Sequence, residues 1–480
     1  MKVKAQSSLM QFSVESQTIL TQPGKLPLWF RANQFGSVPL SGPSTSIIGS
    51  AYKIYDETSS SLIDWSAGVQ VRGNVGNQAY FTLIEGYVKA KGSIFEVTAG
   101  RTKDITGIVD TTLSSGSFSF SGNALGIPKI EIAIPEYYIL PIFNRLFSVK
   151  GSFSYGFFGN QEIFSPYAYV KNAPQYFQQS QLYFRLGHPD WRLKLFGGIN
   201  HNVMFGNEKT IFGPGYKLSP FSAAIYAIFG KTYRDYNNNL YDQQFGGKVG
   251  NHIGSVDAGA TYEFDDVNML VYHQFIYDIG AIGHLANLAD GINGVSFTNK
   301  DEGFDHINWH KILIEFISSR NQAGHLGTTA PSGDEDYYND YEFRNGWSYQ
   351  GLNMGTPLFN DRKYTRDGLI NDPNDHIINN RILGFHGAIQ GSVNRVQLTM
   401  KLTYTQNFGT YGTAIEGHSV PPKFEPPMYG IFSRVDQFSG YIEAGKDFYN
   451  GLSGAVAIGY DKGGIYYNTL GLQLKLKKTF

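Results

Sequence analysis

The sequence contains no cysteine, few charged residues and no long apolar run, and each absence excludes a class of protein. Without cysteine the chain cannot be a disulfide-stapled scaffold, hold a cysteine-ligated metal or carry a lipid on a cysteine. Charged residues make up 16% of the 480 residues, below the roughly 25% of ordinary soluble domains. The net charge of −1 gives no basic surface for nucleic acid, so we expect no nucleic-acid partner.

Membrane-spanning helices are also missing from the sequence. Such a helix needs about 20 consecutive apolar residues, whereas the longest apolar run here is 223–229. The chain instead has 15% aromatic residues and 56 glycines. Many aromatics with few charges favour a membrane β-barrel, because its lipid-facing band excludes charge and is flanked by aromatic girdles.

Several segments alternate apolar and polar residues with the period of two that a β-strand requires. In 470–480, leucines at 470, 472, 474 and 476 fall on one face, while Gln473, Lys475 and Lys477 fall on the other. Segments 394–405 and 452–460 repeat the pattern. A soluble sandwich also alternates, but many such strands with few charges favour lipid on one face and water or a plug on the other.

The alternation and the turn residues predict about eighteen antiparallel strands in one domain spanning 1–480. The candidate strands are 10–19, 28–35, 47–55, 63–75, 79–90, 94–102, 147–156, 178–186, 191–204, 256–264, 267–277, 308–318, 347–354, 378–390, 394–406, 438–448, 452–460 and 465–480. No helical span stands out. The sequence therefore predicts an all-β transmembrane barrel in the bacterial outer membrane.

The residues outside the predicted strands are too many for short turns, so we expect long loops or a plug that occludes the lumen. Segment 126–146 contains Pro128, Pro135 and Pro141, and proline is unfavourable in a central strand. We interpret 126–146 either as a plug segment or as a proline-broken extracellular loop. The terminal aromatic Phe480 resembles the signal read by the barrel-insertion machinery. With Phe480 at the periplasmic end, 359–377 and 408–435 are predicted to be extracellular.

No catalytic, cofactor or metal constellation stands out, and we expect a protein that is not an enzyme. His306 and His310 are four residues apart, which pairs ligands on a helix but separates them by two pleats on a strand. No nucleophile elbow and no phosphate-binding glycine-rich loop occurs. The expected partners of such a barrel are outer-membrane lipid and lipopolysaccharide.

The predicted loops combine aromatic residues with amides and acids, which is the set that binds sugars. Sugar rings stack their C–H faces on aromatic rings, and their hydroxyls need hydrogen-bond partners. The candidate carbohydrate-binding residues are Tyr337, Tyr338, Asn339, Trp347, Tyr349, Gln350 and Tyr411. An interfacial aromatic girdle with polar turns would have the same composition, so both interpretations stay open.

An ordered set of motifs runs over nearly the whole chain. The motifs are PLWFRANQFG at 27–36, GHPDW at 187–191, FGGINH at 196–201, the stretches 315–324 and 336–358, NNR at 379–381 and NFGTYG at 407–412. In these residues the sequence resembles the Wzi family of capsule-assembly proteins, in the form common in Bacteroidetes. An N-terminal helical bundle of the kind found in some members is not recognisable here.

The resemblance implies an outer-membrane lectin with an eighteen-stranded barrel and an occluded lumen. Such a protein binds capsular or exopolysaccharide and helps assemble or retain it at the cell surface. The alternative is a porin or substrate-selective diffusion channel, in which the polar strand faces line an open lumen.

Overall fold

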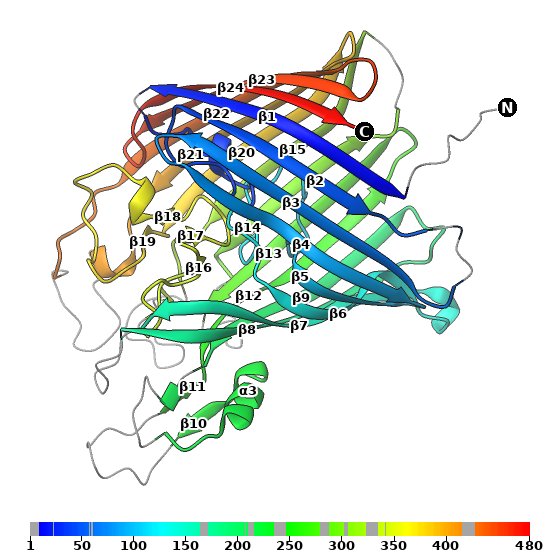
Figure 1. Cartoon of the computed structure of the whole chain (residues 1–480). Helices are drawn as coiled ribbons and strands as arrows, with labels where there is room; N and C mark the ends of the chain where they lie inside the picture. Colours follow the sequence, from blue (N-terminus) through cyan, green and yellow to red (C-terminus); the bar gives the residue numbers. More distant parts are fainter. Residues whose placement is uncertain are drawn as a thin grey trace.

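Eighteen antiparallel strands close into a barrel in the computed structural model (Figure 1). The structure describes residues 9–22, 24–56, 58, 61–163, 171–206, 208–209, 216–234, 246–278, 288–301, 306–322, 335–340, 342–414 and 428–480. The first strand, β1 (Met10–Gln22), closes the ring by pairing with the last, β24 (Thr469–Thr479), with Ser13 opposite Thr479. The predicted fold class is thus confirmed.

The other wall strands follow one another along the chain and pair with their neighbours. They are β2 (Ser44–Lys53), β3 (Asp64–Gly76), β4 (Tyr80–Gly92), β5 (Phe95–Arg101), β6 (Lys129–Ile139), β7 (Phe147–Glu162), β8 (Asn172–Leu186), β9 (Leu193–Phe205), β12 (Asn251–Glu263), β13 (Val267–Asp278), β14 (Gly291–Asn299), β15 (Ile307–Ser318), β20 (Ile382–Val393), β21 (Val396–Asn407), β22 (Val435–Asp447) and β23 (Leu452–Gly463).

Short elements lie in the connections. They are α1 (Leu28–Arg31), η1 (Phe143–Arg145), α3 (Pro220–Ile228), β10 (Thr232–Arg234), β11 (Gly246–Lys248), β16 (Ser348–Tyr349), β17 (Leu352–Asn353), β18 (Asn360–Asp361), η3 (Arg362–Tyr364), β19 (Ile377–Asn379) and η4 (Tyr411–Thr413). Within the described ranges, no helix is long and apolar enough to cross a membrane.

The wall has an apolar outer face and a polar inner face. In β23, Val456 and Ile458 are each 46% exposed, whereas Ala457 between them is 2% exposed. In β24, Leu474 is exposed and Gln473 is buried, so the alternation predicted from the sequence is confirmed. An apolar outer band on a closed barrel is the architecture of outer-membrane proteins. The chain is located in the outer membrane.

The two ends of the barrel differ in the length of their connections. The start of β1 and the end of β24 lie at one end (Figure 1), where most turns are short, such as 394–395 between β20 and β21. The long connections, among them 206–250, 319–381 and 408–434, are all at the other end. Outer-membrane barrels have short periplasmic turns and long extracellular loops. This rule makes the end opposite Phe480 extracellular, in agreement with the predicted sidedness.

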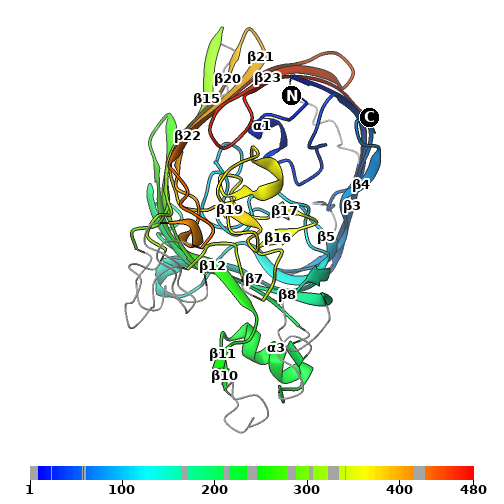
Figure 2. The same ribbon diagram turned by 90° about the vertical axis from the view of Figure 1, so that its left-hand side faces the viewer.

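Three connections from the extracellular end turn into the lumen and form a plug (Figure 2). The plug consists of 24–43 with α1, 102–128, and the described part of 319–381 with β16 to β19. Its interior is apolar: Leu113, Phe118, Trp347 and Phe359 are buried in one cluster.

Two predicted strands are wrong because their residues belong to the plug. Segment 28–35 contains α1, and 347–354 forms the short hairpin of β16 and β17. Two wall strands were missed, β6 and β14. The apolar run 223–229, where no helix was expected, lies largely in α3. The predicted number of strands therefore agrees because the two wrong strands offset the two missed ones.

The predicted role of 126–146, as plug or as extracellular loop, is wrong for all but 126–128, which end plug segment 102–128. Its residues Lys129–Ile139 are β6, which pairs with β5 and β7 in the wall. Pro135 lies at a register break between Ile134 and Tyr138, where β6 and β7 do not pair regularly. Proline is tolerated there because an irregular position does not require its missing N–H.

Candidate functional site

Buried carboxylates of the wall hold plug segment 102–128. Glu315 of β15 accepts the hydroxyl of Ser114 and the backbone N–H of Ser115, both at 2.7 Å, and also the hydroxyl of Tyr272. Asp257 of β12 accepts the N–H of Ile108 at 2.9 Å. Hydrogen bonds to ionised acceptors are roughly twice as strong as neutral ones. These contacts fix the segment against the wall.

The segment with α1 is attached to a neighbouring part of the wall, where β20 alone separates β15 from β21. The N–H of Leu28 donates to Asp461 of β23 at 2.8 Å. The indole Nε1 of Trp29 donates to the hydroxyl of Thr403 on β21 at 3.1 Å. Both donors are buried and would be costly to leave without a partner.

Asparagines hold the plug segment that carries β16 to β19. Asn379 donates to the side chains of Asn360 at 2.7 Å and of Asn407 at 2.9 Å. Asn380 donates to the carbonyl of Tyr337 at 2.8 Å and accepts from Gln322 at 3.0 Å. Asn379, Asn380 and Asn407 belong to two of the motifs that carry the family resemblance. In this structure those motif residues therefore position the plug.

Asp290, just before β14, forms a further attachment of this plug segment. Its carboxylate accepts the N–H of Asn321 at 2.9 Å, the N–H of Gln322 at 2.6 Å and the hydroxyl of Tyr337 at 3.0 Å. Burial raises the pKa of Asp290 to about 6, although these donors act in the opposite direction.

Three aromatic residues predicted to stack on sugars are inside the plug. Tyr337, Tyr338 and Trp347 are 0% exposed. Trp347 Nε1 donates to the carbonyl of Ser119 at 2.8 Å, and the Tyr338 hydroxyl donates to the carbonyl of Phe118. Buried Tyr and Trp need such partners for their polar atoms. The prediction is wrong for these residues, because no ring face is open to a sugar.

The remaining predicted sugar-binding residues are spread over the plug. Tyr349 and Tyr411 are buried, so the prediction is also wrong for them. Asn339 is half-buried, and its side chain pairs with the backbone of Ile377 in both directions at 2.9 Å. Gln350 is exposed in a turn with a φ of 52°. Gln350 and Asn339 remain predictions, and the structure does not bring the seven residues into one site.

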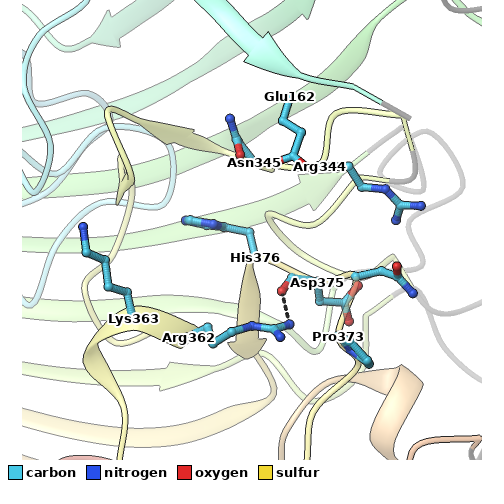
Figure 3. A pocket seen from close by; sticks show the side chains of 9 residues that line it. Glu162, Arg344, Asn345, Arg362, Lys363, Pro373, Asp375 and His376 are labelled. Carbon is cyan, nitrogen blue, oxygen red and sulfur yellow. Dashed lines mark hydrogen bonds between the residues drawn. The ribbon is translucent and has the colours of Figure 1, made fainter. Parts of the chain in front are cut away.

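A polar cavity of about 450 Å³ lies at the extracellular side of the plug (Figure 3). The lining comes from the end of β7 and from three stretches of the plug: Glu162, Arg344, Asn345, Arg362, Lys363, Pro373, Asn374, Asp375 and His376. Sequence reasoning missed this set because its members come from four separate stretches of the chain and form no motif. The cavity is the strongest candidate for a ligand site in the described part of the chain.

The cavity contains three cations and two carboxylates. The guanidinium of Arg362 donates to the backbone carbonyl of Asp372 at 2.5 Å and to that of Asp375 at 2.6 Å, the second of which is drawn in Figure 3, so these bonds fix its position. Nε2 of His376 lies 3.1 Å from Oδ1 of Asp361. Burial raises the pKa of Asp375, and the carboxylates of Asp336 and Asp372 raise it further.

The arrangement suits a ligand with many hydroxyl groups. Arg344, Lys363 and Asn345 offer donors, while the carboxylates offer acceptors. Oδ2 of Asp375 is buried and has no hydrogen-bond partner among the described residues, so it could accept from a ligand hydroxyl. No Phe, Tyr or Trp is among the described residues that line the cavity, and binding there would depend on hydrogen bonds rather than on stacking.

The structure separates the two histidines that were considered as a metal pair. His306 Nδ1 contacts Asn394 at 2.8 Å, whereas His310 Nε2 contacts Ser392 at 3.2 Å. Among the residues placed by the structure, no group of three or more acidic or histidine side chains could hold a metal ion.

Comparisons with known proteins support the fold. No protein-family model and no curated protein sequence matches the chain. Its structure is similar to that of Wzi from Escherichia coli, described as an outer-membrane protein involved in group 1 capsule assembly and a carbohydrate-binding β-barrel. The TM-score is 0.54 at 12% identity, over 97% of this chain and 83% of that one.

Two porin-type structures also match, at lower TM-scores. OccAB2 of Acinetobacter baumannii gives 0.46 at 9% identity, over 98% of both chains. OprD of Pseudomonas aeruginosa gives 0.44 at 8% identity, over 98% of this chain and 94% of that one. At these identities the similarity to Wzi shows a shared barrel fold.

Proposed function

We propose that this barrel is a non-enzymatic member of the Wzi family, of the Bacteroidetes form, that binds capsular or exopolysaccharide at the cell surface. Its role is to help assemble or retain the polysaccharide there. The observation that carries the proposal is a lumen occupied by a plug that is held by buried wall carboxylates. The polar cavity then opens on the side where a surface polysaccharide would be found.

The plug favours this function over diffusion through a porin. An open channel needs a continuous water-filled path, whereas here apolar side chains such as Phe118 and Trp347 are buried at the centre of the lumen. A tightly packed interior has few voids larger than a water molecule. We therefore infer that the barrel serves as a membrane anchor for a binding surface.

The cavity supports the polysaccharide as the ligand because its donors and acceptors match sugar hydroxyls and carboxylates. Its formal charges, three cations against two carboxylates, favour a saccharide that carries acidic groups. Further proposed partners are outer-membrane lipid and lipopolysaccharide, which contact the apolar band, and the insertion machinery, which reads the strand that ends at the exposed Phe480.

The test is binding of purified protein to a glycan array that includes acidic capsular saccharides. We expect Lys363→Ala to weaken binding by about 10- to 100-fold, because one charge-assisted hydrogen bond contributes about 1.5–3 kcal/mol. The control variant is Lys446→Ala, an exposed lysine at the periplasmic end of β22. Absence of saccharide binding by the parent protein, or equal losses in both variants, would contradict the proposal.

A further inference from the structure

The connection between β9 and β12 carries a small unit on the outside of the barrel. The unit contains α3, β10 and β11, and the structure describes it at 206, 208–209, 216–234 and 246–250. Figures 1 and 2 both place these elements outside the wall, unlike the connections that enter the lumen. Because the connection leaves the extracellular end, a unit that projects sideways there lies at the level of the outer leaflet.

One face of α3 packs on the outer surface of the wall. Ala223 and Ala227 are buried in a cluster with Val203 and Phe205 of β9. These two β9 residues point outward, since Asn200 of the same strand points inward and contacts the plug. The small alanine side chains let the helix approach the strand closely.

A polar network lies on the same outer surface next to the unit. His252 contacts the carbonyl of Val249 at 3.0 Å and the ring of His201 at 3.3 Å, and His201 contacts the Tyr277 hydroxyl at 2.7 Å. His201 points outward by the same alternation, and His252 is buried. Imidazole groups facing acyl chains would be costly. We therefore infer that the unit shields His201 and His252 from lipid and is an integral part of the fold.

The opposite face of α3 is apolar and uncovered. Residues four positions apart share a helix face, which places Phe221, Ile225 and Phe229 on the side away from the two alanines. Phe221 is 76% exposed and Phe229 is 67% exposed. Two neighbouring exposed phenylalanines on one helix face are unfavourable in water and mark an interaction surface.

The charged residues in the stretch that carries α3 are all positive. From 216 to 234 the sequence contains Lys217, Lys231 and Arg234 but no Asp or Glu. Lys231 is exposed, and its Nζ lies 5.8 Å from the centre of the Phe229 ring. An apolar aromatic face bordered by lysines is the composition of helices that bind the membrane interface, with the lysines reaching toward anionic headgroups.

We propose that α3 is an interfacial anchor that binds the lipid A part of lipopolysaccharide in the outer leaflet. Phe221 and Phe229 insert among the acyl chains, and Lys217 and Lys231 contact the phosphates. The proposal is independent of polysaccharide binding in the cavity, since the anchor lies outside the wall and the cavity inside it.

The absence of cysteine permits a direct test, because any introduced cysteine is the sole thiol for a spin label. We would label Phe221→Cys and Phe229→Cys in nanodiscs that contain lipopolysaccharide and one barrel each. The lipid control is Leu474→Cys on the outer face of β24, and the water control is Tyr449→Cys in a periplasmic turn. The readout is the collision rate of each label with oxygen and with a water-soluble nickel chelate.

We expect the labels at 221 and 229, like the label at 474, to collide severalfold more often with oxygen than with the nickel chelate. Collision rates at 221 and 229 that match those at position 449, the water control, would overturn the proposal. Labels that report water in single-barrel discs and become protected only when two barrels share a disc would overturn it as well, because the face would then bind a second copy.

The lysine contacts are tested by the lipid that stays bound through purification. Native mass spectrometry of the Lys217→Ala, Lys231→Ala double variant should show severalfold less bound phosphorylated lipid A than the parent. With dephosphorylated lipid A the two proteins should not differ. The control is the double variant Lys446→Ala, Lys477→Ala, at the periplasmic end. Equal retention by the parent and the Lys217 and Lys231 variant would refute the phosphate contact.

Discussion

Replacing Glu315 by alanine should release plug segment 102–128 from the wall. The change removes two plug-to-wall hydrogen bonds, from Ser114 and Ser115, each to a carboxylate oxygen at 2.7 Å. Bonds of this kind contribute about 1.5–3 kcal/mol each, so local opening becomes easier by about 3–6 kcal/mol. Since 1.4 kcal/mol is a factor of ten, amide exchange in the segment should accelerate by about 10²- to 10⁴-fold.

Hydrogen–deuterium exchange of the folded protein, read by mass spectrometry on peptides covering 105–120, measures this effect. Glu315→Gln should give a smaller acceleration, because the amide keeps one oxygen to accept one of the donors. The matched control is Glu443→Ala, since Glu443 bonds Tyr441 and Lys475 within the wall and does not reach the plug. Unchanged exchange in Glu315→Ala, or an equal change in Glu443→Ala, would refute the claim that Glu315 holds the plug.

Three further predictions concern other attachments and assembly. Thr403→Val leaves the buried indole N–H of Trp29 without an acceptor. The free energy of local opening at 28–32 should fall by about 1–3 kcal/mol, so amide exchange there should be faster, while exchange at 105–120 should not change. Burial raises the pKa of Asp290 to about 6, above the roughly 3.9 of an unfolded chain. Ionisation of this group therefore lowers the stability of the folded protein as pH rises from 4 to 6, and the loss is complete above that range. In denaturant unfolding, the free energy of unfolding of Asp290→Asn relative to that of the parent should rise by up to about 3 kcal/mol between pH 4 and pH 7. If this difference does not change with pH, the pKa of the carboxyl is not raised. Phe480→Ala should reduce the yield of folded barrel in cells severalfold while leaving the unfolding midpoint of purified protein unchanged, because the ring is exposed; a shifted midpoint would mean that Phe480 stabilises the barrel itself.

The wall was largely predictable because lipid on one side and a polar plug on the other impose strict alternation. Segments 394–405 and 452–460 show this directly, and both are wall strands. The strand β6 was missed because Pro135 argues against a strand, and only the structure shows that this proline falls at a register break. Local pattern cannot reveal where two strands fail to pair.

The sequence contains more residues than the wall strands and short turns need, so a plug could be expected. The sequence did not show which segments form it. Segment 28–35 alternates enough to resemble a strand, yet it contains α1 and packs inside the barrel. Segments 102–128 and 335–381 combine polar and aromatic residues as loops do, because they form a small core of their own within a polar lumen. A plug therefore has the composition of a loop.

The same ambiguity explains the candidate site. Tyr337 and Trp347 have the composition expected for sugar stacking, but burial is a property of the folded chain and places them in the plug core. The cavity residues Glu162, Arg344 and Asp375 come together only when the plug is folded into the barrel. The motifs that carried the family resemblance include residues, such as Asn379, whose role here is to hold the plug.

The conductance of the purified barrel in planar lipid bilayers tests the central claim most directly. The claim is that a plug fixed to the wall closes the lumen and leaves the extracellular surface to bind polysaccharide. We predict no steady current from the parent protein and transient openings from Glu315→Ala. A large, stable open-channel current from the parent protein would contradict the account and favour a porin.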